Sequence, residues 1–308
     1  MSDLLVVGSV AFDSLETPYG KREKILGGSG NYFSISASFF SKVRLVGVVG
    51  NDFPKDHVNL LQSRGVDTEG LQWADGETFH WSGYYGEDLN QAHTIDTRLN
   101  VFETFSPDLP ESYCDSEVIF LANIDPELQL RVLEQVKTPR LVACDTMNFW
   151  IHGKRQALLK LLRQVDLFVL NEQEIRDLSG EKNLLTAVEW VREQGPQIVV
   201  IKRGEYGAML CTPKSTFWVP AFPLEHVRDP TGAGDTFAGG MMGYLSQVKE
   251  INDENLRQSI AVGTVMASFN VEHFSFDRLL QLEANDIQER YRKLRNMISF
   301  DETSLPFR

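Results

Sequence analysis

Cysteine is scarce in this chain. Its three cysteines, Cys114, Cys144 and Cys211, lie far apart, and no Cys-x-x-Cys pair occurs. This spacing argues against a disulfide framework and against a cysteine-rich zinc site. It is typical of proteins in a reducing compartment, so we expect the protein in the cytoplasm.

Long apolar runs and positive charge are also in short supply. No segment reaches the roughly 18 apolar residues that a membrane-spanning helix needs, so we expect no membrane partner. Lys and Arg number 30 against 43 Asp and Glu, which gives a formal net charge of −13. Because such a chain repels phosphate polyanions, we expect no nucleic-acid partner. A small phosphorylated ligand would need local backbone N–H groups, a lysine or a metal ion.

Two familiar nucleotide-binding motifs are missing. The sequence contains no G-x-x-x-x-G-K-[ST], and no G-x-G-x-x-G follows the first apolar run, Leu4–Val7. The first absence argues against a P-loop enzyme, and the second argues against an NAD-linked oxidoreductase on a Rossmann fold.

What the sequence does have is a series of short apolar runs separated by helical patterns. The runs are nearly continuous, which indicates strands buried on both faces of a parallel sheet. The alternation predicts a doubly wound α/β fold, with helices flanking the sheet, as a single domain over residues 1–308. The predicted strands are Leu4–Val7, Val43–Val49, Val118–Leu121, Leu141–Ala143, Leu167–Leu170 and Ile198–Ile201. The predicted helices are Pro126–Val136, Leu184–Val191, Phe237–Val248 and a surface helix over Phe276–Met297.

Two segments, at about residues 11–27 and 76–105, interrupt this alternation. The second is rich in Thr and aromatic residues and has a turn at Gly86–Asp88, which predicts antiparallel strands. A small β-sheet inserted into an α/β core predicts a lid. Its aromatic residues Phe79, Trp81 and Tyr84 are suited to covering a ligand ring, or to packing in a homodimer formed through the open edges of the lid.

Polar residues follow several predicted strands, namely Asp13, Asn123, Asp145 and Asn171. A turn explains any one of them. Several at the carboxyl edge of an open α/β sheet, where such sheets bind ligands, favour a site there.

The most informative segment is Asp229–Gly240, DPTGAGDTFAGG. Its proline and glycines prevent a helix before residue 233, and the apolar spacing that follows predicts one beyond. Gly232, Ala233 and Gly234 then present consecutive N–H groups at a helix start, without bulky side chains to shield them. This arrangement is suited to hold the oxygens of a phosphoryl group in transfer.

Asp235 lies in the first turn of this predicted helix. The helix dipole favours its carboxylate, so we expect it to be ionised at pH 7. Beside an anion hole, it can accept a proton from an attacking hydroxyl while the N–H groups hold the phosphoryl group. The alternative is a helix-capping acid without a chemical role.

Residues 229–240 closely resemble the second signature of the ribokinase-like PfkB carbohydrate kinases. The resemblance implies a ribokinase-like fold, Asp235 as the catalytic base and Gly232–Gly234 as the anion hole. It also implies ATP and Mg²⁺ as the phosphate donor and its cation. In some members a monovalent cation such as K⁺ binds at the positions that match Asp229 and Thr231.

Further segments resemble the same family at compatible positions. Asn171 and Glu174 match its N-x-x-E element, which implies that they organise the nucleotide phosphates and, through water, magnesium. Gly204 and Gly207 match the glycine turn beside the nucleotide. Lys202, just before that turn, either reaches a phosphate or is an ordinary exposed lysine.

Gly27 and Gly28 match the first signature, in which paired glycines bring the sugar close to the backbone. We place Asn31 with them as a substrate-binding residue, although many members carry asparagine one place later, where this chain has Tyr32. Asp13 matches the acidic residue that follows the first strand. Its carboxylate can accept two hydrogen bonds from a vicinal diol.

Together these residues predict an ATP-dependent kinase that phosphorylates a hydroxyl, a CH₂OH group by preference, of a sugar, sugar acid or nucleoside. A non-catalytic ligand-sensing protein on the same fold is the alternative, and the intact Asp235 and Gly-Ala-Gly segment argue against it.

Overall fold

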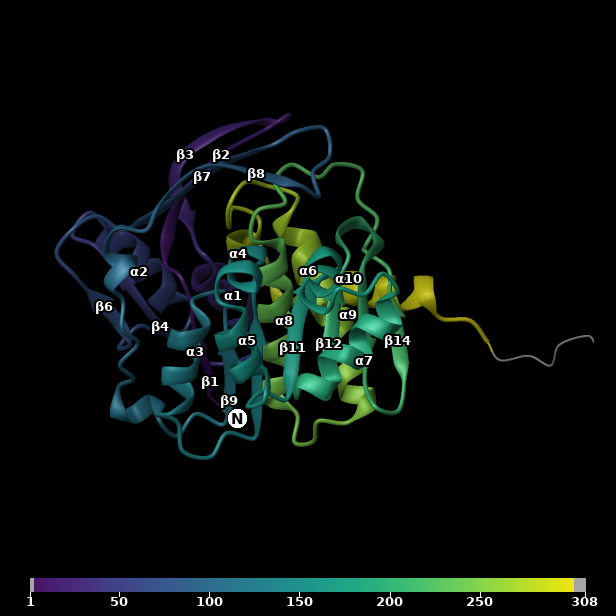
Figure 1. The fold of residues 1–308 in the computed structure, drawn as a ribbon. Coiled ribbons are helices and arrows are strands. Elements are labelled where there is room, and N and C mark those ends of the chain that lie inside the picture. The colour runs from purple at the N-terminus through teal and green to yellow at the C-terminus, as the bar shows by residue number, and fades with distance from the viewer. Residues whose placement is uncertain (1–2, 302–308) are drawn as a thin grey trace, which may run out of the picture.

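A sheet of ten strands forms the middle of the molecule (Figure 1). In the computed structural model, which describes residues 3–301, the strand order is β14-β13-β12-β11-β10-β9-β1-β4-β5, with β6 paired to β4. The pairs from β12 to β5 are parallel, and β13 and β14 are added antiparallel. The strands are β1 (Leu4–Val7), β4 (Val43–Val49), β5 (Val66–Asp67), β6 (Leu71–Trp73), β9 (Val118–Leu121), β10 (Leu141–Asp145), β11 (Leu167–Asn171), β12 (Ile198–Lys202), β13 (Ala208–Cys211) and β14 (Thr216–Val219).

All six predicted apolar runs are strands of this sheet, and their side chains are buried on both faces. Three of the strands run on to a polar residue at the carboxyl end: Asp145, Asn171 and Lys202. The strand β4, which follows in the chain, pairs with one side of β1, and the later strand β9 pairs with the other side of β1. This reversal makes the carboxyl end of β1 a topological switch point, the usual place for a ligand in such folds.

Helices cover both faces of the sheet (Figure 1). Each face has its own apolar cluster, so the fold has the three layers expected of a doubly wound protein. One layer contains α1 (Ser29–Ala37), α2 (Lys55–Ser63), α8 (Ala233–Gln247), α9 (Asp253–Asn270) and α10 (Ala284–Ile298). The other contains α3 (Pro126–Leu133), α4 (Asn148–Gly153), α5 (Arg155–Leu162), α6 (Glu172–Ser179) and α7 (Leu184–Gln194).

A separate sheet of four strands arches over the carboxyl edge of the central sheet (Figure 1). Its strands are β2 (Ala11–Thr17), β3 (Gly20–Gly27), β7 (Phe79–Tyr85) and β8 (Ala92–Arg98), in the order β3-β2-β7-β8. The two segments that interrupt the sequence pattern therefore form one sheet. The expectation of antiparallel strands holds for β2–β3 and β7–β8, but β2 and β7 pair in parallel, because they belong to separate hairpins.

Two predicted helices are shorter than expected. Helix α3 ends at Leu133 rather than Val136, and Pro139 follows shortly after. The segment Phe276–Met297 becomes an α-helix only at Ala284, where a capping box starts it. The residues before it bury Phe276 and Leu279 in the core and form only a short 3-10 turn at Leu279–Gln281.

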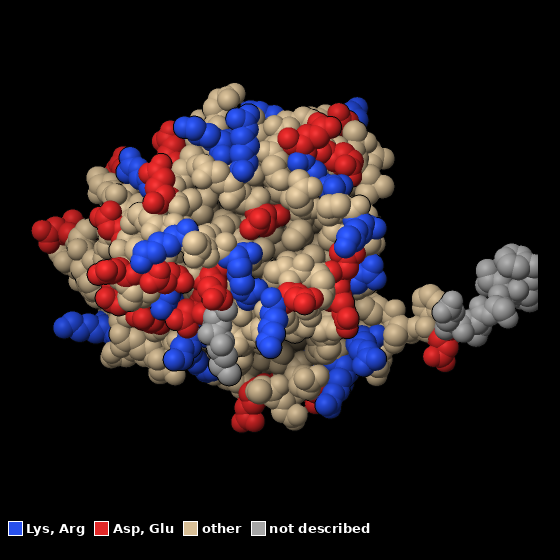
Figure 2. Space-filling model, turned by 90° about the horizontal axis from the view of Figure 1, so that it is seen from below, with Lys and Arg blue, Asp and Glu red and all other residues tan. Residues whose placement is uncertain are grey.

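Acidic and basic side chains alternate over the end of the molecule opposite the small sheet (Figure 2). The excess of negative charge therefore does not form a single acidic field on this face. Within residues 3–301, no helix is long and apolar enough to cross a bilayer.

Candidate active site

Polar residues from three neighbouring strands meet the start of α8 below the small sheet. Asp145 ends β10, Asn171 ends β11 and Lys202 ends β12. The first turn of α8 carries Asp235. The electrostatic influence of Asp145 and Lys202 on Asp235 places these groups in one cluster.

The start of α8 has the left-handed turn that its glycines permit. Gly232 is the N-cap with φ of 71°, and a Cβ atom there would collide with the ring of Tyr32. The N–H of Ala233 donates to the Pro230 carbonyl at 3.1 Å. Among residues 3–301, no hydrogen bond takes the N–H of Gly232 or Gly234. The anion hole therefore offers two free amides rather than the three that the sequence predicted, because the turn itself uses one.

Burial acts against the expectation that Asp235 is ionised at pH 7. Burial raises the pKa of Asp235 to about 7, the charge of Asp145 adds to the rise, and Lys202 opposes it. The protonated form is therefore accessible near neutral pH. The sequence argument counted the helix dipole and could not count the desolvation.

Asn171 and Glu174 hold each other in a capping box at the start of α6. The Asn171 side chain accepts the N–H of Glu174 at 2.8 Å, and Glu174 Oε2 accepts the N–H of Asn171 at 2.6 Å. Burial raises the pKa of Glu174, Lys202 opposes this, and Asp145 and Asp235 add to it. Glu174 therefore belongs to the same electrostatic cluster as Asp235.

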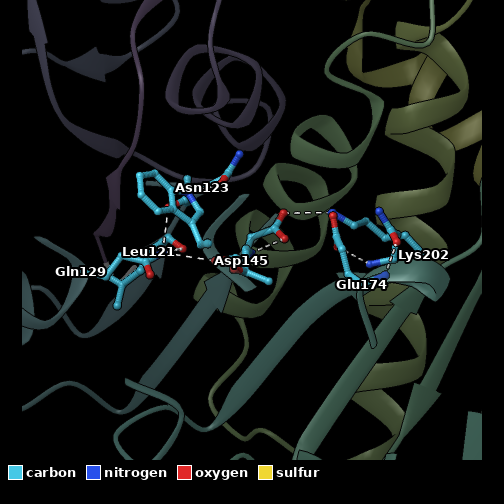
Figure 3. Close-up of polar contacts among 10 residues, drawn as sticks. Leu121, Asn123, Gln129, Asp145, Glu174 and Lys202 are labelled. Atoms are coloured by element: carbon cyan, nitrogen blue, oxygen red, sulfur yellow. Dashed lines mark hydrogen bonds and ion pairs between the residues drawn. The ribbon is translucent and has the colours of Figure 1, made fainter. Parts of the chain in front are cut away.

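Lys202 is not an exposed surface lysine. Its Nζ donates to Asp145 Oδ2 at 2.9 Å, as Figure 3 shows, with Glu174 beside it. Burial alone would lower the pKa of Lys202, but Asp145, Glu174 and Asp235 together raise it. Asp145 is the residue that sequence reasoning left without a role. Its position at the end of a buried strand was the only feature of the sequence that indicated a place in the site.

Asp13 lies directly over the Gly27–Gly28 turn. A Cβ atom at Gly27 would overlap the Asp13 carboxylate, so the carboxylate, rather than a sugar, occupies the space above that glycine. Gly28 has φ of 92°, and a Cβ atom there would lie 2.5 Å from the Ser9 carbonyl oxygen. Burial raises the pKa of Asp13 to about 8, with the charges of Asp229 and Asp235 adding to the rise. The protonated form is thus favoured at neutral pH, whereas we expected a carboxylate.

Asn31 and Tyr32 are both buried in α1. The Asn31 amide donates to the Gly27 carbonyl at 2.6 Å, so this side chain supports the Gly27–Gly28 turn from below. Tyr32 packs between Gly232 and Phe276, whose ring centroid lies 4.4 Å from its own. Tyr32 therefore links the Gly27–Gly28 turn to the start of α8.

The small sheet presents one aromatic face to this cluster. Asp13 and Trp81 are partners in the register of β2 and β7, so they lie on the same face, as does Tyr85. The Trp81 ring lies over Gly83, where a Cβ atom would collide with it, and the Thr231 hydroxyl donates to the Tyr85 hydroxyl at 3.3 Å. Sequence reasoning missed Tyr85, which the alternation of β7 could have indicated.

The other two predicted lid aromatics lie elsewhere. Phe79 stacks on Phe102 with 5.3 Å between ring centroids, and Tyr84 stacks on His93 on the opposite face of the small sheet. Phe79 and Trp81 both alternate onto the face of Asp13, but Phe79 is occupied by its stacking on Phe102, and Tyr84 lies on the opposite face.

The glycine turn after β12 meets the tip of the small sheet. A Cβ atom at Gly204, where φ is 53°, would collide with the Asn90 side chain from the β7–β8 connection. A Cβ atom at Gly207, where φ is 90°, would collide with the Val219 carbonyl. Both positions thus require glycine because other segments of the same protein pack against them.

The sequence model of the pfkB carbohydrate kinase family matches residues 1–280. A cytidine kinase of Thermococcus kodakarensis is 32% identical over 258 residues, which cover 82% of this chain and 92% of the relative. The chain belongs to the PfkB family of carbohydrate kinases. It is thus a phosphotransferase that uses an alcohol group as acceptor.

More distant proteins are also similar to this PfkB kinase, one in sequence and one in fold. An inositol 3-kinase of Arabidopsis thaliana is 25% identical over 315 residues, covering 96% of this chain and 82% of the relative. The solved structure of a putative Ribokinase II from E. coli with ATP and Mg²⁺ matches with a TM-score of 0.75 at 19% identity, covering 95% of this chain and 100% of that one. The predicted ribokinase-like fold is confirmed.

PfkB kinases use ATP with Mg²⁺. The described part of this chain has few side chains that could serve as ligands of the ion. Within residues 3–301, no group of three or more His, Cys, Asp or Glu is arranged to hold a metal. Mg²⁺ usually keeps several waters and takes one or two carboxylates plus substrate phosphates. The buried Glu174, with one oxygen fixed by Asn171, fits the part of such a carboxylate.

The cation position that some PfkB kinases have beside the anion hole is filled here by the protein's own hydrogen bonds. The Asp229 oxygens accept the N–H groups of Thr231 at 2.9 Å and of Ser275 at 3.1 Å. The Thr231 carbonyl accepts the Asn270 amide at 2.8 Å. Donors of the chain therefore compete with a monovalent cation for these oxygens.

Proposed function

We propose that this PfkB kinase transfers the γ-phosphoryl group of ATP to a CH₂OH group, with Asp235 as the general base. The observation that carries this proposal is the position of Asp235, one residue after two free amides at a helix start. Two free N–H groups and a helix dipole favour the oxygens of a phosphoryl group. A group that accepts a proton is then in place beside the acceptor hydroxyl.

In this mechanism the chain positions two substrates and moves one proton. Asp13 and the Gly27–Gly28 turn hold the acceptor, and the ionised form of Asp235 takes the proton of its hydroxyl. The Gly232 and Gly234 amides, with Lys202, stabilise the charge on the transferring group. Bound Mg²⁺ neutralises part of the phosphate charge. Asn171, Glu174, Gly204 and Gly207 form the nucleotide side of the site.

We propose a nucleoside as the preferred acceptor, ahead of a free sugar or a sugar acid. Trp81 offers an aromatic plane on the face that carries Asp13, and a nucleobase has a flat ring that can stack on it. The 32% identical relative is a cytidine kinase, which supports the same class. Trp81→Ala should raise the KM of nucleosides more than that of ribose, and Tyr84→Ala, on the opposite face, is its matched control.

The small sheet acts as a lid in this proposal. Its segment 76–105 contacts the loop before α8 through Tyr85 and the Gly204 turn through Asn90, and its segment 11–27 carries Asp13. A closed lid excludes water and limits ATP hydrolysis without an acceptor. We further propose that its exposed side, which carries Tyr84 and Ile95, contacts a second copy of the chain. Light scattering that gives a monomer mass at assay concentration would contradict the dimer.

Potassium is dispensable in this proposal, because the Asp229 and Thr231 oxygens already accept hydrogen bonds. Replacing K⁺ by tetramethylammonium at constant ionic strength should leave the initial rate within about twofold, far less than the tenfold that 1.4 kcal/mol represents. A rate that collapses without K⁺ would show that the loop rearranges around a cation.

The deciding experiment is an ADP-release screen over nucleosides, sugars and sugar acids, followed by Asp235→Asn with the best acceptor. The variant should keep ATP binding, measured by calorimetry, and lose about 10²- to 10⁴-fold in kcat, as expected for a lost general base. Near-normal turnover in Asp235→Asn would refute the role of the residue. Ligand binding without ADP release in the wild type would favour a binding protein instead.

A further inference from the structure

Lys202 and Asp145 reach each other across the end of the strand between them. They end β12 and β10, and β11 lies between these strands. The Nζ–Oδ2 distance is 2.9 Å, and the side chains are 19% and 4% exposed (Figure 3). A lysine side chain is long and flexible, so this partner fixes where its ammonium group lies.

Hydrogen bonds fix both the side chain and the backbone of Asp145. Its Oδ1 accepts the N–H of Thr146 at 2.7 Å, and its carbonyl accepts the Gln129 amide at 3.2 Å. The same amide of the fully buried Gln129 also holds the Leu121 and Ala122 carbonyls at the end of β9, and Figure 3 shows this contact with Leu121. The carboxylate therefore has a defined position before any ligand arrives.

The ammonium group so placed lies beside the anion hole. A Cβ atom on Gly234 would be 3.1 Å from Lys202 Nζ, so the ammonium group lies close against this glycine. Within the described part of the chain, Lys202 Nζ donates only to Asp145. Two of its three N–H bonds are thus left for a ligand next to the free amides of Gly232 and Gly234.

We propose that Asp145 is a positioning residue, which holds the Lys202 ammonium beside the anion hole until Lys202 donates to the transferring phosphoryl group. The inference rests on the proposed phosphotransfer and adds Asp145 to it. Burying an ammonium group without a partner is unfavourable in free energy. Asp145 therefore also stabilises the charged Lys202 side chain before a ligand binds. Pre-placed donors act without reorganisation at the moment of reaction.

The charges around this pair predict a change in the pH dependence of the rate, which a purely structural role of Asp145 would not produce. The groups that face it are Glu174 from α6 and Asp235 from α8. The charge of Asp145 raises the pKa of Asp235, and that of Lys202 lowers it. Removing Asp145 should therefore move the acid limb of kcat/KM to lower pH, and removing Lys202 should move it to higher pH.

The test uses the full chain with Asp145→Asn, Lys202→Met, the double variant and Asp125→Asn. Asp125 also contacts a lysine, Lys154 at 3.3 Å, and it caps α3, a role that asparagine keeps. It is the matched control, because it caps a helix on the face of the sheet opposite α8. We expect Lys202→Met to lower kcat about 10²-fold. Asp145→Asn should lower it about tenfold, as for an outer residue that orients a ligand.

If Asp145 acts through Lys202, the double variant should be no slower than Lys202→Met. An Asp145→Asn effect that is as large in the Lys202→Met background as in the wild type would overturn the proposal, and so would kinetics like those of Asp125→Asn. Should Asp145→Asn fail to fold, an unchanged kcat in Lys202→Met would still overturn it. Absence of ADP release by the wild type would instead refute the phosphotransfer itself.

Discussion

Asp235 lies in the first turn of α8, where the helix dipole stabilises a carboxylate, yet its pKa is about 7. The dipole contributes about 0.3–1 kcal/mol at a helix start. The rise from the usual 3.8 to about 7 corresponds to about 4 kcal/mol in the other direction. Burial therefore outweighs the dipole, and the pKa of the proposed base lies near neutral pH, where a general base is most effective.

A pH profile follows from this value. Because Asp235 must lose its proton to act as a base, kcat/KM should rise with pH and level off above an apparent pKa near 7. Initial rates between about pH 5 and pH 9 at constant ionic strength would measure it. A rate that is already maximal at the acid end of this range would contradict the assignment of the acid limb to Asp235.

The loop before α8 and the β7 strand meet through the hydroxyls of Thr231 and Tyr85. Tyr85→Phe removes this hydrogen bond between the small sheet and the anion-hole loop, so the lid should close less firmly. We expect the KM of the acceptor to rise roughly twofold to tenfold, the range for one lost hydrogen bond. ATP hydrolysis without acceptor should increase as well. Both are measured by ADP release.

Tyr84→Phe is the control for this variant, because Tyr84 lies on the same strand and faces the other way. Equal effects of the two substitutions would show that the strand, rather than the Tyr85 hydroxyl, determines closure.

The elements that the sequence predicts well are those fixed by local patterns. Continuous apolar runs predicted six strands of the central sheet: β1, β4, β9, β10, β11 and β12. The proline and glycines of the Asp229–Gly240 segment predicted the start of α8. The parallel pairing of β2 with β7 could not be predicted, because it joins two hairpins that are far apart in the chain. The pairing of Asp145 with Lys202 spans 57 residues and follows only from the strand order.

At the scale of the whole molecule, the buried acids link folding to pH. The pKa of Asp235 lies above its usual value in the folded protein, so the folded state holds a proton that the unfolded state has released between about pH 4 and pH 7. The free energy of unfolding therefore falls as the pH rises towards 7. Asp13, with a pKa of about 8, acts in the same direction.

Asp235→Asn removes the cost of ionising this buried group and should stabilise the fold above neutral pH. The gain in melting temperature over the wild type should be larger at pH 8.5 than at pH 5.5, by a few degrees per kcal/mol for a chain of this size. Asp277→Asn, at an exposed position, is the control and should show no such trend. A gain that is the same at both pH values would mean that Asp235 is ionised throughout.

The overlap between the Asp13 carboxylate and the space above Gly27 also constrains how the acceptor preference of this enzyme can evolve. Alanine at position 27 would displace the carboxylate while Asp13 is present, but it would be harmless once position 13 has become small. The two positions can therefore change in one order only. Any laboratory selection for a new acceptor should recover position 13 mutations first, and position 27 mutations only in their descendants.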